Sequence, residues 1–483
     1  MKKLFGTDGM RGEAGRFPLD AETMRATGRS LAMRLAVQTG RAPRIVLGRD
    51  TRESGAWIED AFLSGARAAG AVCESAGVIT TPGVAFLART LPADAGIVIS
   101  ASHNPFQDNG IKIFAPDGRK FDEATERLIE ADIYAARGVQ DAEDATAATL
   151  APPATDAGAT ETTRSSGVGV EGETVDAPGE TTEASAALRA RYLEYLAGDV
   201  ARGLRLDGQS IVLDCANGAS SALAPALFER LGARVFAINH TPDGRNINLD
   251  SGSLHIEGLQ RKVSETRATL GVAYDGDADR ALFVDAQGNL VDGDATLWVL
   301  AARMQARGEL AGDAVVATVM SNLGLELALK ARGLMLLRTD VGDKYVLEEL
   351  LRTGATLGGE QSGHIIFPRE SLAGDGLITT IQMLRALSET GRALQQLTEG
   401  FVRYPQVLVN VRVGEKRPFE EVAEIARRKR EVEARLGAQG RLLLRYSGTE
   451  NLARVMIEGQ SQDEIEELAG SLAGLIGQVL GVN

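Results

Sequence analysis

The sequence is poor in the residues that usually build disulfide or zinc sites. It has only two cysteines, Cys73 and Cys215, and four histidines among 483 residues. Two cysteines are too few for a disulfide framework, and neither lies in a CxxC or Cys/His spacing typical of zinc ligands. We therefore expect both cysteines to be buried as small apolar residues. Because histidine is so rare, His103, which stands beside a serine after an apolar run, is a candidate functional residue.

The sequence also lacks long apolar segments and clusters of positive charge. No segment approaches the roughly 20 consecutive apolar residues of a membrane helix. No apolar run follows the two lysines near the start, as a signal peptide would require. The net charge is −14, whereas a nucleic-acid surface needs clustered lysine and arginine. The expectation is a soluble, cytoplasmic protein that binds neither membranes nor nucleic acids.

Large apolar residues are almost absent from one segment, residues 138–187. It is rich in Ala, Thr, Gly and Glu and carries ten acidic residues and one arginine, which account for most of the net charge. Such a segment buries too little apolar surface to offset the entropy lost on ordering. We predict a flexible acidic insertion without a function of its own.

The rest of the chain resembles ordinary globular sequence, and 44% of all residues are hydrophobic. Three times, a β-branched run is followed by a turn and an amphipathic helix, an alternation typical of mostly parallel sheets covered by helices. Beyond about residue 401, short strands and a final helix indicate a smaller α+β domain. The predicted fold is α/β, with three similar domains of mixed, mostly parallel sheets and the smaller C-terminal domain. The expected boundaries are residues 1–137, 188–293, 294–400 and 401–483.

Three aspartates at a spacing of two follow a short apolar strand in the segment DGDADR, residues 275–280. Asp275, Asp277 and Asp279 would repel one another unless a cation neutralised them, and their hard oxygens favour Mg²⁺ or Ca²⁺. An EF-hand is excluded because its sixth position needs glycine and holds Arg280. A haloacid-dehalogenase phosphatase motif fits imperfectly because Asp279 stands at its fifth position. Metal binding is the preferred interpretation.

Three further loops carry groups suited to phosphate or sugar chemistry. In ASHNPFQDNGIKIF, Ser102 lies between two predicted strands, with Lys112 further along. The Ser102 hydroxyl is either a nucleophile or a turn cap, and no G-x-S-x-G elbow supports the first role. GGEQSGH, residues 358–364, places a carboxylate, a hydroxyl and an imidazole among glycines. RYSGTEN, residues 445–451, offers an arginine fork and backbone N–H groups to a phosphate, or is a plain hairpin turn.

These four loops, in this order and with one in each predicted domain, resemble the motifs of the α-D-phosphohexomutase superfamily. The similarity runs from LFGTDGMRG at Leu4 to ENLARVMIEG near Gly459 and omits the acidic insertion. Members have three related α/β domains and a fourth, smaller one around a central cleft. The resemblance therefore implies a sugar-phosphate mutase with this architecture.

The resemblance implies catalytic roles for the first two loops. Ser102 is expected to carry a phosphoryl group. One Mg²⁺ per chain is expected on Asp275, Asp277, Asp279 and an oxygen of the phosphorylated Ser102. Lys112 is the expected general acid/base, with a pKa lowered by burial near cations. The remaining residues expected beside the reacting groups are Arg11, His103 and Arg280.

The resemblance also implies how the sugar phosphate is held. The expected contacts to sugar hydroxyls are Glu360, Ser362 and His364. The expected clamp for the non-reacting phosphate consists of Arg445, Ser447, Gly448 and Thr449. Phospho-Ser102 would give its phosphoryl group to the substrate, forming a sugar 1,6-bisphosphate. That intermediate would turn over before the serine takes back the other phosphate.

The motifs together are most similar to those of family members that interconvert glucosamine 6-phosphate and glucosamine 1-phosphate, a step toward UDP-N-acetylglucosamine and cell-wall precursors. Two alternatives stay open. One is a mutase for mannose or glucose phosphates, and the other is a phosphatase that uses Asp275 as nucleophile while Ser102 is only structural. The expected partner is a small sugar phosphate, and a homodimer is left open.

Overall fold

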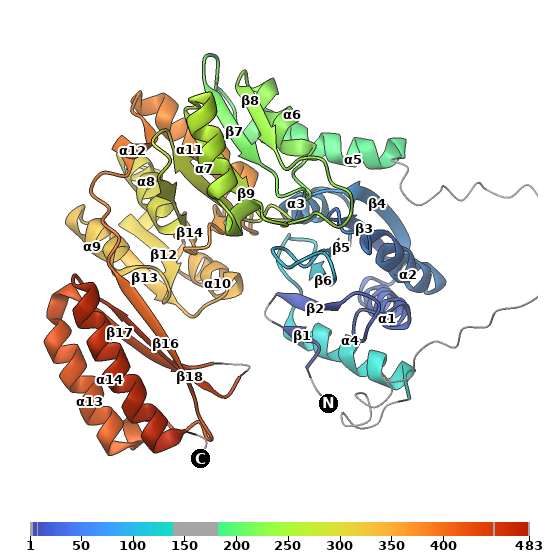
Figure 1. The fold of residues 1–483 in the computed structure, drawn as a ribbon. Coiled ribbons are helices and arrows are strands. Elements are labelled where there is room, and N and C mark those ends of the chain that lie inside the picture. Colours follow the sequence, from blue (N-terminus) through green and yellow to red (C-terminus); the bar gives the residue numbers. More distant parts are fainter. Residues whose placement is uncertain (1–2, 7, 139–181, 448–449, 482–483) are drawn as a thin grey trace, which may run out of the picture. The chain divides into compact units, whose positions relative to one another are not determined.

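The computed structural model describes residues 3–6, 8–138, 182–447 and 450–481. The chain forms two compact units: residues 1–259 with 273–279, and residues 260–272 with 280–483. Figure 1 shows the sheets in chain order, each accompanied by helices. Among the described helices, none is long and apolar enough to span a membrane.

The first domain holds a six-stranded mixed sheet. Its elements are β1 (Phe5–Gly6), β2 (Gly9–Glu13), α1 (Ala21–Thr39), β3 (Arg44–Arg49), α2 (Gly55–Ala68), β4 (Val72–Val78), α3 (Thr81–Thr90), β5 (Ala95–Ile99), β6 (Asp108–Phe114) and α4 (Glu123–Ala136). The strand order is β1-β2-β6-β5-β3-β4, with β3 parallel to β4 and β5 and with β6 antiparallel to β5 and β2. α1 packs against both α2 and α4, whereas α3 lies against β3 and β5 (Figure 1).

Burial on both faces explains why β3 and β5 read as continuous apolar runs. Ile45, Leu47 and Ile97 belong to the core that includes α1 and α2. A Cβ at Gly48 or Gly96, on the alternate positions, would meet Val84 of α3. Strands covered by helices on both sides lose the polar-apolar alternation of a half-exposed sheet.

The second domain contains a five-stranded sheet in the order β11-β10-β9-β7-β8. β7 and β8 are parallel, whereas β10 and β11 form an antiparallel pair. Its elements are α5 (Glu183–Glu194), the π-helix η2 (Tyr195–Val200), β7 (Ser210–Asp214), α6 (Leu223–Arg230), β8 (Arg234–Ile238), the 3₁₀-helix η3 (Gly252–Leu254), α7 (Glu257–Thr266), β9 (Leu270–Tyr274), β10 (Ala281–Asp285) and β11 (Leu290–Val291).

The expected end of the acidic insertion at residue 187 is wrong, because α5 begins at Glu183. The Thr182 side chain accepts the N–H of Ser185 as an N-cap, and the Ser185 hydroxyl donates to a backbone carbonyl of β4. These polar contacts hold a helical turn that carries few apolar residues. Residues 139–181, where most of the predicted insertion falls, lie outside the described residues.

The third domain has a four-stranded sheet in the order β13-β12-β14-β15. β12 is parallel to β13 and β14, and β14 and β15 form an antiparallel pair. Its elements are α8 (Gly293–Ala306), η4 (Ala311–Asp313), β12 (Ala314–Thr318), α9 (Leu323–Ala331), β13 (Met335–Thr339), α10 (Asp343–Thr353), β14 (Gly358–Gly359), β15 (Ile365–Ile366), α11 (Gly376–Thr390) and α12 (Leu394–Leu397).

The C-terminal domain is a three-stranded antiparallel sheet in the order β16-β18-β17 with helices packed on it. Its elements are β16 (Gln406–Arg412), η5 (Phe419–Glu421), α13 (Ala423–Leu436), η6 (Gly437–Gln439), β17 (Arg441–Tyr446), β18 (Leu452–Glu458) and α14 (Gln462–Leu480). Ala453, Val455 and Ile457 alternate along β18 into one core with residues of α13 and α14. The prediction of three α/β domains with mixed sheets and a smaller α+β domain is confirmed.

The two cysteines are unpaired, as expected, but only one is fully buried. Cys215 is buried directly after β7, whereas Cys73 on β4 is half-buried. β4 lies at one edge of the first sheet, and an edge strand leaves part of its side chains near solvent.

Candidate active site

Ser102 lies in the loop between β5 and β6, beyond the carboxyl end of β5. The residue is buried, and its φ of +53° lies in the left-handed region that side chains rarely adopt. Its hydroxyl donates a 2.5 Å hydrogen bond to Asp275 Oδ2, and His103 Nδ1 lies 3.3 Å from the same oxygen. The loop therefore presents the serine oxygen directly to the aspartate loop.

The aspartate loop approaches the Ser102 loop closely because it contains a glycine. Gly276 stands between Asp275 and Asp277, and a Cβ at this position would lie 2.5 Å from the carbonyl oxygen of Ser102. Real Cβ atoms do not come so near a backbone oxygen. The absence of a side chain at Gly276 thus allows the two loops to touch.

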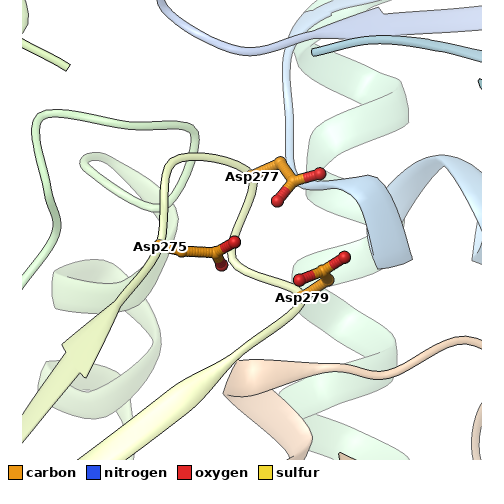
Figure 2. Close-up of side chains that lie close together, drawn as sticks. All are labelled: Asp275, Asp277 and Asp279. Atoms are coloured by element: carbon orange, nitrogen blue, oxygen red, sulfur yellow. The ribbon is translucent and has the colours of Figure 1, made fainter. Parts of the chain in front are cut away.

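Asp275, Asp277 and Asp279 form a cluster at the place where the sequence predicts a metal ion. All three are buried, and one oxygen from each lies within 4.8 Å of the others. Figure 2 shows their carboxylates converging from one loop that follows β9. Asp277 Oδ2 accepts hydrogen bonds from Thr81 Oγ1 at 2.6 Å and Lys112 Nζ at 3.0 Å.

The donor set fits a hard divalent cation. Asp277 Oδ1 is buried and, within the described part of the chain, accepts no hydrogen bond. A buried carboxylate oxygen without a donor is costly unless a cation satisfies it. Three clustered carboxylates supply oxygen ligands of the kind that Mg²⁺ prefers. The cluster can therefore bind a metal ion.

Lys112 extends from β6 into the same cluster. Its Nζ lies 3.2 Å from Asp8 Oδ2, 3.0 Å from Asp277 Oδ2 and 3.5 Å from Asp279 Oδ2. Burial alone would favour the neutral amine, but Asp277, Asp8 and Asp279 outweigh it and hold the pKa of Lys112 well above its ordinary value. The expected lowering of this pKa is therefore wrong in direction, because carboxylates surround the amine.

Arg11 on β2 also reaches this region. It forms an ion pair with Asp8 and donates to the Ala101 carbonyl at 3.3 Å, next to Ser102. Burial would raise the pKa of Asp8, but Lys112, Lys120 and Arg11 together hold it well below the ordinary range. The structure thus places Arg11, Lys112 and His103 in the neighbourhood of Ser102. Arg280 follows the aspartates in the chain and begins the next segment of the second unit.

The loop between β14 and β15 positions Glu360, Ser362 and His364. The Glu360 carboxylate accepts the Gly342 N–H at 3.1 Å and the Ser362 hydroxyl at 3.2 Å. His364 is buried, and its Nε2 accepts the N–H of Gly374 at 3.2 Å. That bond fits a role of His364 in fixing the loop. Contacts of these three side chains with a sugar stay predictions.

Arg445 and Ser447 stand at the end of β17, and Gly448 and Thr449 lie outside the described residues. Arg445 is directly opposite Arg454 of β18 in the antiparallel register. Burial lowers the pKa of Arg445, and the neighbouring Arg454 lowers it further. The Ser447 carbonyl accepts a 2.7 Å hydrogen bond from Lys416. This accumulation of positive charge suits an anion, and the phosphate clamp itself stays a prediction.

Sequence reasoning missed several residues that hold the site, including Arg52, Thr81 and Asn248. All act across long sequence separations, and no local motif marks them. One signal was available for Arg52, which follows β3. Since β3 and β5 are adjacent and parallel, residues beyond their carboxyl ends meet at the same edge of the sheet. A charged turn after β3 is therefore expected beside the Ser102 loop.

Four family matches cover most of the chain. They are phosphoglucomutase/phosphomannomutase α/β/α domain I over residues 2–138, domain II over 190–288, domain III over 292–404 and the C-terminal domain over 408–475. In this order they define the class of protein as an α-D-phosphohexomutase.

Two relatives are similar to this chain over nearly their whole lengths. The phosphoglucosamine mutase of Solibacter usitatus (strain Ellin6076) is 46% identical over 480 residues, which cover 99% of each chain. That of Koribacter versatilis (strain Ellin345) is 44% identical over 487 residues, which cover 100% of this chain and 98% of the relative. The chain belongs to the phosphoglucosamine mutase family, which confirms the resemblance.

Solved structures share the fold. A phosphoglucomutase/phosphomannomutase family protein from Burkholderia thailandensis matches with a TM-score of 0.75 at 23% identity, covering 99% of this chain and 97% of that chain. The N-acetylphosphoglucosamine mutase of Aspergillus fumigatus, in complex with GlcNAc-6P and magnesium, matches with a TM-score of 0.58 at 19% identity. The match covers 90% of this chain and 82% of that chain. At these identities the likeness supports the architecture only.

Proposed function

We propose that this chain interconverts glucosamine 6-phosphate and glucosamine 1-phosphate through a phosphorylated Ser102 and a sugar 1,6-bisphosphate. The observation that carries the proposal is the 2.5 Å contact between the Ser102 hydroxyl and Asp275 within a cluster of three buried carboxylates. A serine that only capped a turn would not need a metal-binding cluster beside its hydroxyl. The relatives named phosphoglucosamine mutase supply the choice of sugar.

Asp275, Asp277 and Asp279 are the residues that would hold one Mg²⁺ together with an oxygen of phospho-Ser102. When bound, the ion would supply positive charge that offsets the charge of the transferring phosphoryl group. The three buried carboxylates and the donor-free Asp277 Oδ1 support this assignment.

Each transfer exchanges one phosphorus–oxygen bond for another. A sugar hydroxyl oxygen forms a bond to phosphorus while the bond between phosphorus and Ser102 Oγ breaks, and the proton of the sugar hydroxyl is released to a base. The serine oxygen then takes up a proton. After the bisphosphate has turned over, the reverse exchange moves the other phosphoryl group to Ser102. Lys112 is the proposed acid and base, because an Mg²⁺ on the aspartates would offset the carboxylates that raise its pKa. Arg11 and His103 would hold the group in line.

The second unit supplies the proposed sugar and phosphate contacts. Glu360, Ser362 and His364 would face the sugar hydroxyls. The phosphate that is not reacting would be bound by Arg445, Ser447, Gly448 and Thr449, whereas Arg280 would add positive charge beside the transferring phosphoryl group. Either phosphate of the bisphosphate must bind to this clamp in turn. Contacts to the phosphate group itself therefore suit the clamp better than contacts to one face of the sugar.

A cytoplasmic location, a homodimer and a place in UDP-N-acetylglucosamine and cell-wall precursor synthesis are parts of the same proposal. The location and the pathway follow from the chemistry of the substrate, whereas the homodimer is left open. A glucosamine phosphate is a charged small molecule that an enzyme meets where sugar nucleotides are made. Size measurement in solution tests the homodimer.

Peptide mass spectrometry of Ser102 combined with a coupled assay on glucosamine 6-phosphate tests the proposed function. An acid-stable phosphoryl label that disappears in Ser102→Ala is expected, together with faster turnover on glucosamine phosphates than on glucose or mannose phosphates. Faster turnover on mannose or glucose phosphates would indicate the sibling mutase. A hydroxylamine-labile label lost only in Asp275→Asn would indicate a phosphatase instead.

A further inference from the structure

Arg52 is a buried arginine whose N–H groups are used to hold the Ser102 loop. Its Nε donates to Asp50 Oδ2 at 2.9 Å, and both side chains of this pair are fully buried. Its two terminal nitrogens donate to four backbone carbonyls of the loop that contains Ser102. These carbonyls belong to Ser102, Asn104, Pro105 and Asp108. A guanidinium has five N–H donors in a fixed plane. One donates to Asp50 and four donate to these carbonyls, so every N–H of the Arg52 guanidinium has an acceptor.

Asn248 approaches two of the same carbonyls from another part of the first unit. Its Nδ2 donates to the Ser102 carbonyl at 2.9 Å and to the Asn104 carbonyl at 3.0 Å. Its own backbone has a φ of +60°, in the left-handed region. The carbonyls of Ser102 and Asn104 therefore each accept one hydrogen bond from Arg52 and one from Asn248.

The amide side of Ser102 is held as firmly as the carbonyl side. The Ser102 N–H donates to Ser100 Oγ at 2.9 Å, and Ser100 donates in turn to Asp50 Oδ2 at 2.7 Å. The Asp50 carboxylate therefore accepts hydrogen bonds from both Ser100 and Arg52. Both backbone groups of Ser102 are fixed while the residue keeps its unfavourable φ of +53°.

We propose that Arg52 and Asn248 are positioning residues that hold the backbone of Ser102, so that its phosphoryl group stays in line with the sugar hydroxyl in both transfers. This inference rests on the proposed function. A left-handed serine that lost these donors would relax toward an ordinary conformation and turn its Oγ away from Asp275. Neither side chain is proposed to touch the sugar, so their loss should lower kcat and leave KM nearly unchanged.

Asn248→Gly tests the proposal without straining the backbone, because glycine adopts a φ of +60° freely. Arg52→Lys keeps the positive charge beside Asp50 but loses the planar fork. Asn239→Gly is the matched control, since Asn239 also has a left-handed φ but bonds Asp214 rather than the Ser102 loop. The unfolding midpoint of each variant in urea, the phosphorylated fraction of Ser102 by mass and the ³¹P resonance of phospho-Ser102 accompany the kinetics.

We expect kcat per phosphorylated Ser102 to fall about tenfold in Asn248→Gly and about a hundredfold in Arg52→Lys, as small misplacements do. KM for glucosamine 6-phosphate should stay within about twofold of wild type, and the ³¹P resonance should shift or broaden. Asn239→Gly should match wild type in all three.

Unchanged turnover per phosphoserine in both variants, a loss carried by KM alone, or an equal loss in Asn239→Gly would overturn the positioning role. So would a ³¹P resonance identical to wild type in both variants. If wild type itself shows neither phosphoserine nor mutase turnover, the proposed function fails and the inference fails with it. An active wild type with unaffected variants removes only the inference.

Discussion

Ser102 and the three aspartates lie in the first compact unit, whereas the loops at Glu360 and Arg445 lie in the second. Ser102 and the aspartates are buried, and Ser102 is hydrogen-bonded from several elements. Glu360 and Arg445 are only half-buried. Groups that act on a developing charge work best when they are fixed in advance in a dry site. Groups that receive a sugar phosphate from water must remain accessible.

A half-buried carboxyl group, that of Asp8, and a buried one, that of Asp294, show the same contrast in electrostatic terms. Lys112, Lys120 and Arg11 hold the pKa of Asp8 in the first unit well below its ordinary value despite burial. Burial and the neighbouring Asp292 raise the pKa of Asp294 in the second unit to about 7. The first unit concentrates cations where phosphoryl chemistry is proposed. At Asp294 of the second unit, Arg338 lowers the pKa but does not offset burial and Asp292.

Removal of the reactive hydroxyl should have the largest effect. In Ser102→Ala we expect mutase turnover to fall by at least about a thousandfold, since the covalent intermediate is lost. The fold should persist because the change deletes one oxygen, and circular dichroism checks this. Ser221→Ala, on a half-buried serine of the same unit, is the control and should keep its turnover. Undiminished turnover in Ser102→Ala would contradict the assigned chemistry of the first unit.

Weakening the aspartate cluster comes next. Asp277→Asn keeps the shape of the side chain but removes a charge, and we expect Mg²⁺ to bind about a hundredfold more weakly. Calorimetric titration of the purified protein with Mg²⁺ measures this without any reaction. Asp214→Asn is the control because Asp214 is another buried carboxyl at a strand end of the same unit, outside the cluster. Equal Mg²⁺ affinity in wild type and Asp277→Asn would show that the metal lies elsewhere.

The two regions also differ in how well the sequence reveals them. Ser102 and the aspartates could be predicted because each follows a short apolar strand within one contiguous motif. Arg52, Thr81 and Asn248 lie in no such motif and reach the site across 50, 196 and 146 positions of the chain. In the sequence a buried arginine looks like any surface arginine. Only the pairing of β3 with β5 brings Arg52 to the Ser102 loop.

The architecture could be predicted from alternating strands and helices, but two local features could not. The start of α5 was missed because its first turn is held by hydrogen bonds at Thr182 and Ser185 rather than by apolar burial. The direction of the Lys112 pKa was wrong because spacing shows nothing of the carboxylates from distant segments that surround the amine. Both errors come from polar contacts made across the tertiary structure.

A change in the sugar-binding loop should act mainly on binding. In Glu360→Gln the side chain keeps its size but loses its negative charge. The Glu360 carboxylate oxygens accept hydrogen bonds from the Gly342 N–H and the Ser362 hydroxyl. We expect KM for glucosamine 6-phosphate to rise about tenfold while kcat changes less, because one charge-assisted hydrogen bond is weakened. Glu348→Gln, on an exposed glutamate of α10, is the control for charge alone. A fall in kcat with unchanged KM would place Glu360 with the chemical groups instead.

The last effect concerns stability rather than turnover, and it tests the electrostatic contrast between the two units. Because burial raises the pKa of Asp294 to about 7, the folded protein holds its proton more tightly than the unfolded chain, whose carboxyl titrates near pH 4. The stability gained from this proton is present below about pH 4 and is lost as the pH rises to about 7. Asp294→Asn keeps an acceptor for the Asn322 N–H and removes the titration.

The variant should therefore gain on wild type between pH 5 and pH 8, by about 3 kcal/mol, because roughly two pKa units lie between pH 5 and the folded pKa. Urea unfolding at both pH values measures the difference, and Asp313→Asn, on an exposed aspartate, should show no such gain. If the wild type and Asp294→Asn curves run parallel from pH 5 to pH 8 and diverge only below pH 5, the buried carboxyl is ionised at neutral pH. The second unit would then stabilise a buried charge as the first unit does, and the contrast between the two units would be confined to exposure.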